Sequence, residues 1–148
     1  MESEKGLSVT EIYELEQHTE VELPLFELRI PACFPSPGDD YADKKLDLNE
    51  FLIKHPAATF LVKVSGNSMK DAGIHDGDTL IVDRALEATD KSIVVAIING
   101  DFTVKRIHMK ENKVYLVAEN TNYSPIEVTP EMSFEVWGVV AYVIHKPI

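Results

Sequence analysis

The sequence predicts a mainly β protein, in which one compact β domain follows a short extended N-terminal arm. Six runs between residues 58 and 145 are rich in the β-branched and aromatic residues that strands favour. Asn99-Gly100 stands between two of these runs and is a strong signal for a tight hairpin. A length of 148 residues with 45% hydrophobic residues suits a single domain with a real core.

The N-terminal part of the chain is patterned more weakly. The stretch "SVTEIYELEQ" (8–17) favours a short helix, with a serine or threonine available to cap its start. The stretch "PSPGDD" (35–40) places two prolines and a glycine within four residues, which breaks regular structure. We therefore expect an acidic, flexible arm over residues 1–33 and the β domain over residues 34–148.

Beyond the arm, one helix precedes the strands. "LDLNEFLIKHP" (46–56) favours a helix because Asp47 is a good N-cap, Glu50 occupies the capping-box position and Pro56 ends the run. Strands are then expected at 58–66, 79–83, 92–98, 101–107, 113–119 and 134–145.

Charge and composition exclude several classes of function. The net charge is −11, and residues 1–31 carry eight acidic against two basic side chains. Phosphate contacts need clustered Lys and Arg, so direct sequence-specific DNA binding is not expected. The single cysteine, Cys33, and the absence of a basic, apolar leader or a membrane-length apolar run indicate a cytoplasmic protein without membrane contact.

A metal site is not expected, and no cofactor is implied. The five histidines lie at no spacing typical of metal ligands, and one cysteine adds little. They are His18, His55, His75, His108 and His145.

The stretch "SGNSM" (65–69) presents an exposed-looking hydroxyl, Ser68, between turn-rich runs. Lys105 lies in "DFTVKRI", where a strand flanked by apolar residues can desolvate an amine until it is neutral near pH 7. A neutral Lys105 can accept the Ser68 proton, and the backbone N–H groups of Asn67 and Ser68 at the tight turn can stabilise an oxyanion. These residues alone leave open a histidine-assisted serine hydrolase, or an ordinary turn serine beside a solvated lysine.

The pattern as a whole resembles the LexA/UmuD family of self-cleaving Ser–Lys proteins, and its UmuD-like branch most closely. The similarity covers roughly residues 25–145 and rests on the following stretches: "CFPSPGDDYADKKLDLNEFLIKHPAATFLVKVSGNSM", "DGDTLIVD", "GDFTVKR", "NYSPIEV" and "VWGVV".

The resemblance implies a serine peptidase of the Ser–Lys type. It assigns Ser68 as the nucleophile and Lys105 as the general base, on a mainly β domain that dimerises. It places self-cleavage in the arm at Ala32-Cys33, where this chain has cysteine in place of the usual glycine. Asp76, Gly77, Asp78, Met69, Asn120, Tyr123 and Pro125 are interpreted as structural.

The resemblance also implies partners and a cellular role. The arm is too short for the DNA-binding domain of a repressor, which favours the UmuD-like branch. That branch implies a bacterial SOS-response mutagenesis protein whose self-cleavage is stimulated by a RecA filament on single-stranded DNA. The processed homodimer would then act with a UmuC-like subunit in error-prone translesion DNA synthesis. Two alternatives stay open: a non-catalytic dimeric interaction module of the same fold, and a Ser–Lys peptidase acting on other proteins.

Overall fold

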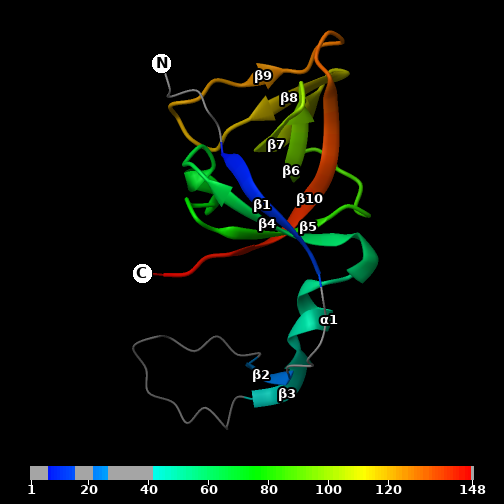
Figure 1. Ribbon diagram of the computed structural model, residues 1–148, viewed down its shortest axis with the longest axis vertical. Coiled ribbons are helices and arrows are strands. Elements are labelled where there is room, and N and C mark those ends of the chain that lie inside the picture. The colour runs from blue at the N-terminus through cyan, green and yellow to red at the C-terminus, as the bar shows by residue number, and fades with distance from the viewer. Residues whose placement is uncertain (1–6, 16–21, 27–41, 148) are drawn as a thin grey trace. The chain divides into compact units, whose positions relative to one another are not determined.

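The computed structural model describes residues 7–15, 22–26 and 42–147 (Figure 1). The chain divides into two compact units. The larger unit comprises residues 1–15 and 55–148, and the smaller comprises residues 16–54.

The larger unit is an antiparallel β structure, which confirms the predicted fold class. The strand order is β1-β4-β5-β10-β6-β7-β8-β9, and β1 also pairs with β7. The first six strands of that order therefore close into a ring. The strands are β1 (Ser8–Glu14), β4 (Thr59–Ser65), β5 (Thr79–Asp83), β6 (Ile93–Ile98), β7 (Asp101–Lys110), β8 (Lys113–Val117), β9 (Ile126–Glu127) and β10 (Phe134–Ile144).

The main core lies inside this ring and includes Leu7, which directly precedes β1. Its fully or almost fully buried members are Leu7, Val62, Val64, Met69, Ile74, Leu80, Val82, Val95 and Val104. Trp137 packs against this cluster, with its ring 5.3 Å from the ring of Phe60 and 5.8 Å from that of Phe102. Strand alternation explains the pattern, since every second residue of each strand points inward.

The predicted hairpin between β6 and β7 is confirmed. Asn99 and Gly100 both have positive φ (49° and 86°), as a two-residue turn of this type requires. Ile98 pairs with Asp101 across the turn, and the same register places Val94 opposite Lys105. The turn therefore sets the position of Lys105 in the sheet.

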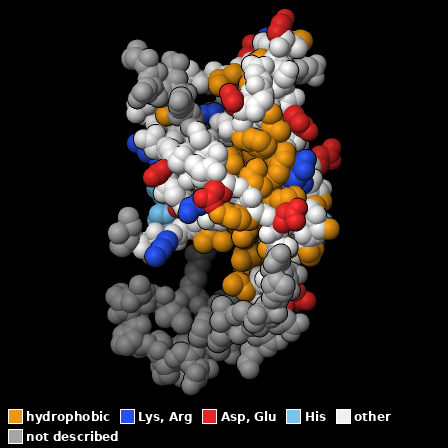
Figure 2. Space-filling model, viewed as in Figure 1, with side chains coloured by type: hydrophobic (Ala, Val, Ile, Leu, Met, Phe, Trp, Pro, Cys, Tyr) orange, Lys and Arg blue, Asp and Glu red, His pale blue; other side chains and the backbone are white. Residues whose placement is uncertain are grey.

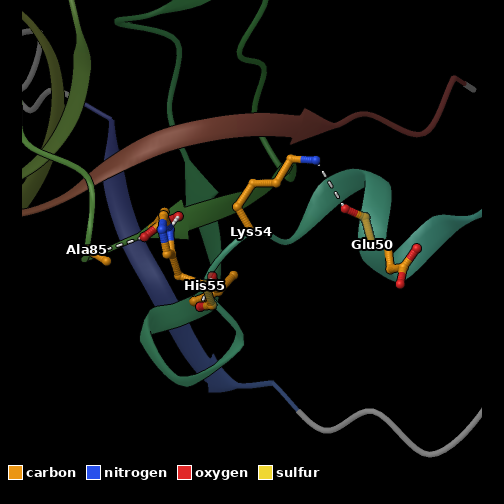
Figure 3. Close-up of polar contacts among 6 residues, drawn as sticks. Glu50, Lys54, His55 and Ala85 are labelled. Carbon is orange, nitrogen blue, oxygen red and sulfur yellow. Dashed lines mark hydrogen bonds and ion pairs between the residues drawn. The ribbon is translucent and has the colours of Figure 1, made fainter.

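The start of β4 is fastened to the end of β5. The Nδ1 atom of His55 lies 2.6 Å from Oδ2 of Asp83, and the other carboxylate oxygen accepts the N–H of Ala85 at 2.8 Å (Figure 3). The Thr59 hydroxyl donates to the His55 carbonyl at 2.7 Å. These contacts follow a short 3-10 helix, Pro56–Ala58, which leads into β4.

The smaller unit contains a two-stranded antiparallel pair, β2 (Glu22–Phe26) and β3 (Ala42–Asp47), and the helix α1 (Leu48–Leu52). The predicted cap is confirmed, because the Asp47 side chain accepts the N–H of Asn49 at 3.0 Å. The helix ends at Leu52, before Pro56, and the Lys54 ammonium donates to the Glu50 carbonyl at 3.3 Å (Figure 3).

The predicted helix over residues 8–17 is wrong, because residues 8–14 form β1 and residues 16 and 17 lie outside the described residues. Val9, Thr10 and Ile12 are β-branched and suit a strand, and the antiparallel ladder to β4 supplies the backbone hydrogen bonds that a short helix would have made itself. Strands β2, β3 and β9 were not predicted. The boundary predicted at residues 33 and 34 lies outside the described residues. Within the described part of the chain, no helix has the length and apolar character to cross a membrane.

Candidate active site

The turn that carries Ser68 is held by a second turn further along the chain. Gly66 has a φ of 108°, which glycine adopts readily, and its N–H donates to Oδ1 of Asp76 at 2.8 Å. The N–H of Gly77 donates to the Val64 carbonyl at 3.0 Å. Asp76 and Gly77 thus have the structural role predicted for them, because they fix the path of the chain on either side of "SGNSM".

Ser68 is fully buried, although the sequence suggested an exposed hydroxyl. One residue that contacts it is Leu7, whose side chain is itself fully buried in the core. The backbone N–H of Leu7 donates to Oγ of Ser68 at 2.5 Å, across 61 positions of sequence. The nucleophile candidate is therefore covered by the chain's own N-terminal segment.

Lys105 is also buried, with 6% of its surface exposed, on β7. Burial lowers the pKa of its ammonium below the ordinary value of 10.5, because desolvation disfavours the charged form. Its Nζ atom lies 5.4 Å from the centre of the Tyr123 ring. Among the described residues, no carboxylate forms an ion pair with Lys105 that would raise the pKa again. This side chain is therefore suited to hold and release a proton nearer neutrality.

Leu7 connects the two candidate residues. Its N–H contacts Ser68, and its carbonyl accepts the Val104 N–H at 3.4 Å and the Thr103 hydroxyl at 3.3 Å. Thr103 and Val104 directly precede Lys105 on β7. The turn after β4 and the strand β7 therefore face the same residue from two sides.

The loop after β8 braces the Ser68 turn. Asn120 is 4% exposed, and its amide donates to the Asn67 carbonyl at 2.9 Å. The Tyr123 hydroxyl lies 3.4 Å from the side-chain oxygen of Asn67. The N–H of Glu119 donates to the sulfur of Met69 at 3.3 Å, and the Glu119 carboxylate pairs with Arg106 on β7.

The sequence predicted Ser68, Lys105 and Asn67 as site residues, and Asn120 has the structural role predicted for it. The contact of Leu7 with Ser68 was not predicted. The sequence around Leu7 has no motif that indicates a contact with Ser68, because a single leucine in an acidic segment is compatible with many positions. The cleavage-site residues Ala32 and Cys33 lie outside the described residues. Within the part of the chain that the structure describes, no group of three histidine, cysteine or acidic side chains could hold a metal ion.

Comparisons with known proteins agree with the motifs. The model of the family described as Peptidase S24-like matches residues 24–141. Protein MucA of Salmonella typhimurium is 43% identical over 128 residues, which cover 85% of this chain and 87% of MucA. Protein SamA of Salmonella typhimurium is 45% identical, with 83% of this chain and 85% of SamA covered. The LexA repressor of Shewanella baltica is 40% identical, with 84% of this chain and 58% of the repressor covered.

Proposed function

Because the chain belongs to the peptidase S24-like family, the LexA/UmuD family that its motifs resemble, we propose that it cleaves itself at Ala32-Cys33 with a Ser68–Lys105 dyad. The observation that carries this proposal is the buried Lys105, whose pKa is lowered by desolvation with no ion pair among the described residues to offset it. A lysine in that state is a poor structural cation and a good general base.

The reaction proceeds in two halves. Neutral Lys105 takes the proton of Ser68 while Oγ attacks the carbonyl carbon of Ala32. The tetrahedral intermediate collapses, the bond from Ala32 to the nitrogen of Cys33 breaks, and Lys105 returns its proton to the leaving amine. Water then attacks the ester between Ala32 and Ser68, with Lys105 again accepting a proton. The bond from the Ala32 carbonyl carbon to Oγ breaks, and Lys105 returns the proton to Oγ of Ser68. The products are two chains, one ending at Ala32 and the other starting at Cys33.

The oxyanion donors of this proposal are the backbone N–H groups of Asn67 and Ser68. The Asn67 carbonyl and the Ser68 N–H belong to one planar trans peptide unit, so fixing one fixes the other. The Asn67 carbonyl accepts hydrogen bonds from the Asn120 amide at 2.9 Å and from the Lys70 N–H at 3.2 Å. This bracing supports a donor that is held in place before the reaction, the property that oxyanion stabilisation requires.

We also propose the cellular role that the UmuD-like branch implies. The chain is a bacterial SOS-response mutagenesis protein, cleaved when it meets a RecA filament on single-stranded DNA. The processed homodimer joins a UmuC-like subunit for translesion DNA synthesis in the cytoplasm. The net charge of −11 supports contact with DNA through partners. Apolar side chains gathered over β6 and β10 (Figure 2) support an interface with another protein surface.

The dyad is tested with three variants incubated at alkaline pH without any partner. Ser68→Ala and Lys105→Ala should each reduce self-cleavage at least about a thousandfold, and the double variant should be no slower, because the members of one catalytic unit are not additive. Circular dichroism should show all three folded. Continued cleavage at Ala32-Cys33 in folded Ser68→Ala would refute the assignment, and cleavage by none of the proteins, the parent included, would favour a non-catalytic interaction module.

A further inference from the structure

The N-terminal strand β1 lies beside Ser68 and pairs with both β4 and β7, and we call the place that it fills the groove. We propose that the groove between β4 and β7 is a strand-binding site whose resident occupant is the segment 7–14, and that this segment keeps Ser68 unreactive until it leaves. The inference rests on the proposed function, since it concerns access to the same serine.

The backbone contacts of Leu7 are those of a bound peptide. Its N–H donates to Ser68 on the β4 side, and its carbonyl accepts from Thr103 and Val104 on the β7 side. The next residue, Ser8, pairs with both Ser65 and Thr103. Both backbone groups of Leu7 are thus used by the walls of one groove, which is how an added β-strand is recognised.

The contact with Ser68 is unreactive for a geometric reason. A hydroxyl that accepts a hydrogen bond from an amide N–H lies near the plane of that peptide, on its hydrogen side. Attack on a carbonyl requires the oxygen to approach from above the plane instead. In addition, Ser68 and Leu7 are both fully buried, so a second peptide cannot reach Oγ while Leu7 is in place. Segment 7–14 and the bond Ala32-Cys33 therefore cannot lie beside Ser68 at the same time.

The backbone of the segment pairs with β4 along β1, whereas its side chains are buried at one end and otherwise lie on the surface. Along β1 only Val9 is partly buried, and the other six side chains are exposed, including Ile12 at 39% and Tyr13 at 50%. Leu7 is the one member of the described part of the segment that lies in the core cluster. Leu7 is thus the fully buried side chain that holds the segment in addition to the β1–β4 ladder, and weakening it should raise the fraction of molecules with an open groove.

The first test compares Leu7→Ala with the matched control Ile12→Ala, each in the full chain. Three quantities are measured: hydrogen exchange in residues 7–14, labelling of Ser68 by a small sulfonyl fluoride, and formation of the fragment 33–148. Leu7→Ala should raise labelling and fragment formation about tenfold or more, while exchange in β6 and β10 stays unchanged. Ile12→Ala should stay within about twofold of the parent for all three.

The second test fixes the strand in place. Glu11 pairs with Lys63 across β1 and β4, and both side chains are exposed, so the pair can be replaced by cysteines without disturbing the core. The variant carries Glu11→Cys and Lys63→Cys in a Cys33→Gly background, which removes the natural cysteine. Labelling of Ser68 and fragment formation should fall at least about tenfold when the disulfide forms and should recover when it is reduced. The reduced form of the same variant therefore serves as the control.

The outcomes separate this inference from the proposed self-cleavage. Faster exchange in residues 7–14 of Leu7→Ala with unchanged or slower labelling of Ser68 overturns the inference, as does equal labelling of the oxidised and reduced cysteine variant. If no protein forms the fragment, the proposed function fails, and labelling of Ser68 alone decides whether the strand covers the serine. If Leu7→Ala does not fold, the disulfide variant decides.

Discussion

Lys105 illustrates at the scale of one residue how a functional group can oppose stability. A buried ammonium without an ion-pair partner among the described residues is unfavourable, since desolvation is not offset by attraction. In the proposed dyad this cost serves the reaction, since a lysine that stayed fully charged near pH 7 could not take a proton from Ser68. Two predictions follow from the direction of the pKa shift.

The first prediction concerns stability. The pKa of Lys105 is lower in the folded than in the unfolded chain, so the unfolded chain binds the proton more tightly and stability rises with pH between the two pKa values. Lys105→Met removes the penalty. Its denaturant midpoint should exceed that of the parent at pH 7, and the difference should shrink toward pH 10. Lys110→Met, at an exposed position of the same strand, should show neither effect. If the midpoint of Lys105→Met exceeds that of the parent by the same amount at all pH values, the cause is packing and not charge.

The second prediction concerns the rate of self-cleavage without partners. The rate should rise with pH as Lys105 loses its proton and should level off below the ordinary lysine value of 10.5. Fragment formation followed by mass spectrometry from pH 6 to 11, in protein shown by circular dichroism to stay folded, gives the profile. A rate independent of pH over that range would contradict a lysine base.

At the scale of elements, β10 shows how closely the sheet is packed. Gly138 lies where the register of β10 with β6 shifts, and an added Cβ there would meet Cγ1 of Val82 at 2.5 Å. Val82 is fully buried and short, so it cannot move aside. Gly138→Ala should therefore lower the free energy of unfolding by about 1–3 kcal/mol. Urea unfolding measures this, and Ala141→Ser, exposed on the same strand, should change it by less than about 0.5 kcal/mol.

The elements also show what a sequence can reveal. The strands from β4 to β8 and β10 were predictable because each has its own run of β-branched residues, and the hairpin has its own turn signal at Asn99-Gly100. β1 was not predictable, since its state is decided by a ladder to β4 about fifty residues away, and local propensity favoured a helix. Ser68 and Lys105 could likewise be predicted because each lies in a local sequence motif. The contact of Leu7 with Ser68 joins residues 61 positions apart and has no local motif.

At the scale of the whole molecule, the N-terminal part of the chain contributes both a strand of the β domain and the bond proposed for cleavage. Residues 8–14 complete the ring of strands, and the bond proposed for cleavage lies further along the same segment of sequence. Cutting at Ala32-Cys33 would therefore separate β1 from the rest of the chain. If the cut segment then leaves, the β4 and β7 edges near Ser68 become exposed, and the surface of the domain changes as well as its length.

The most direct test of the account is the intact mass of the protein after incubation with RecA, nucleotide and single-stranded DNA. The account predicts a product with the mass of residues 33–148, absent without the filament on the same timescale and absent from Ser68→Ala. An unchanged mass in the parent, or the same product in folded Ser68→Ala, would contradict self-cleavage by the Ser68–Lys105 dyad.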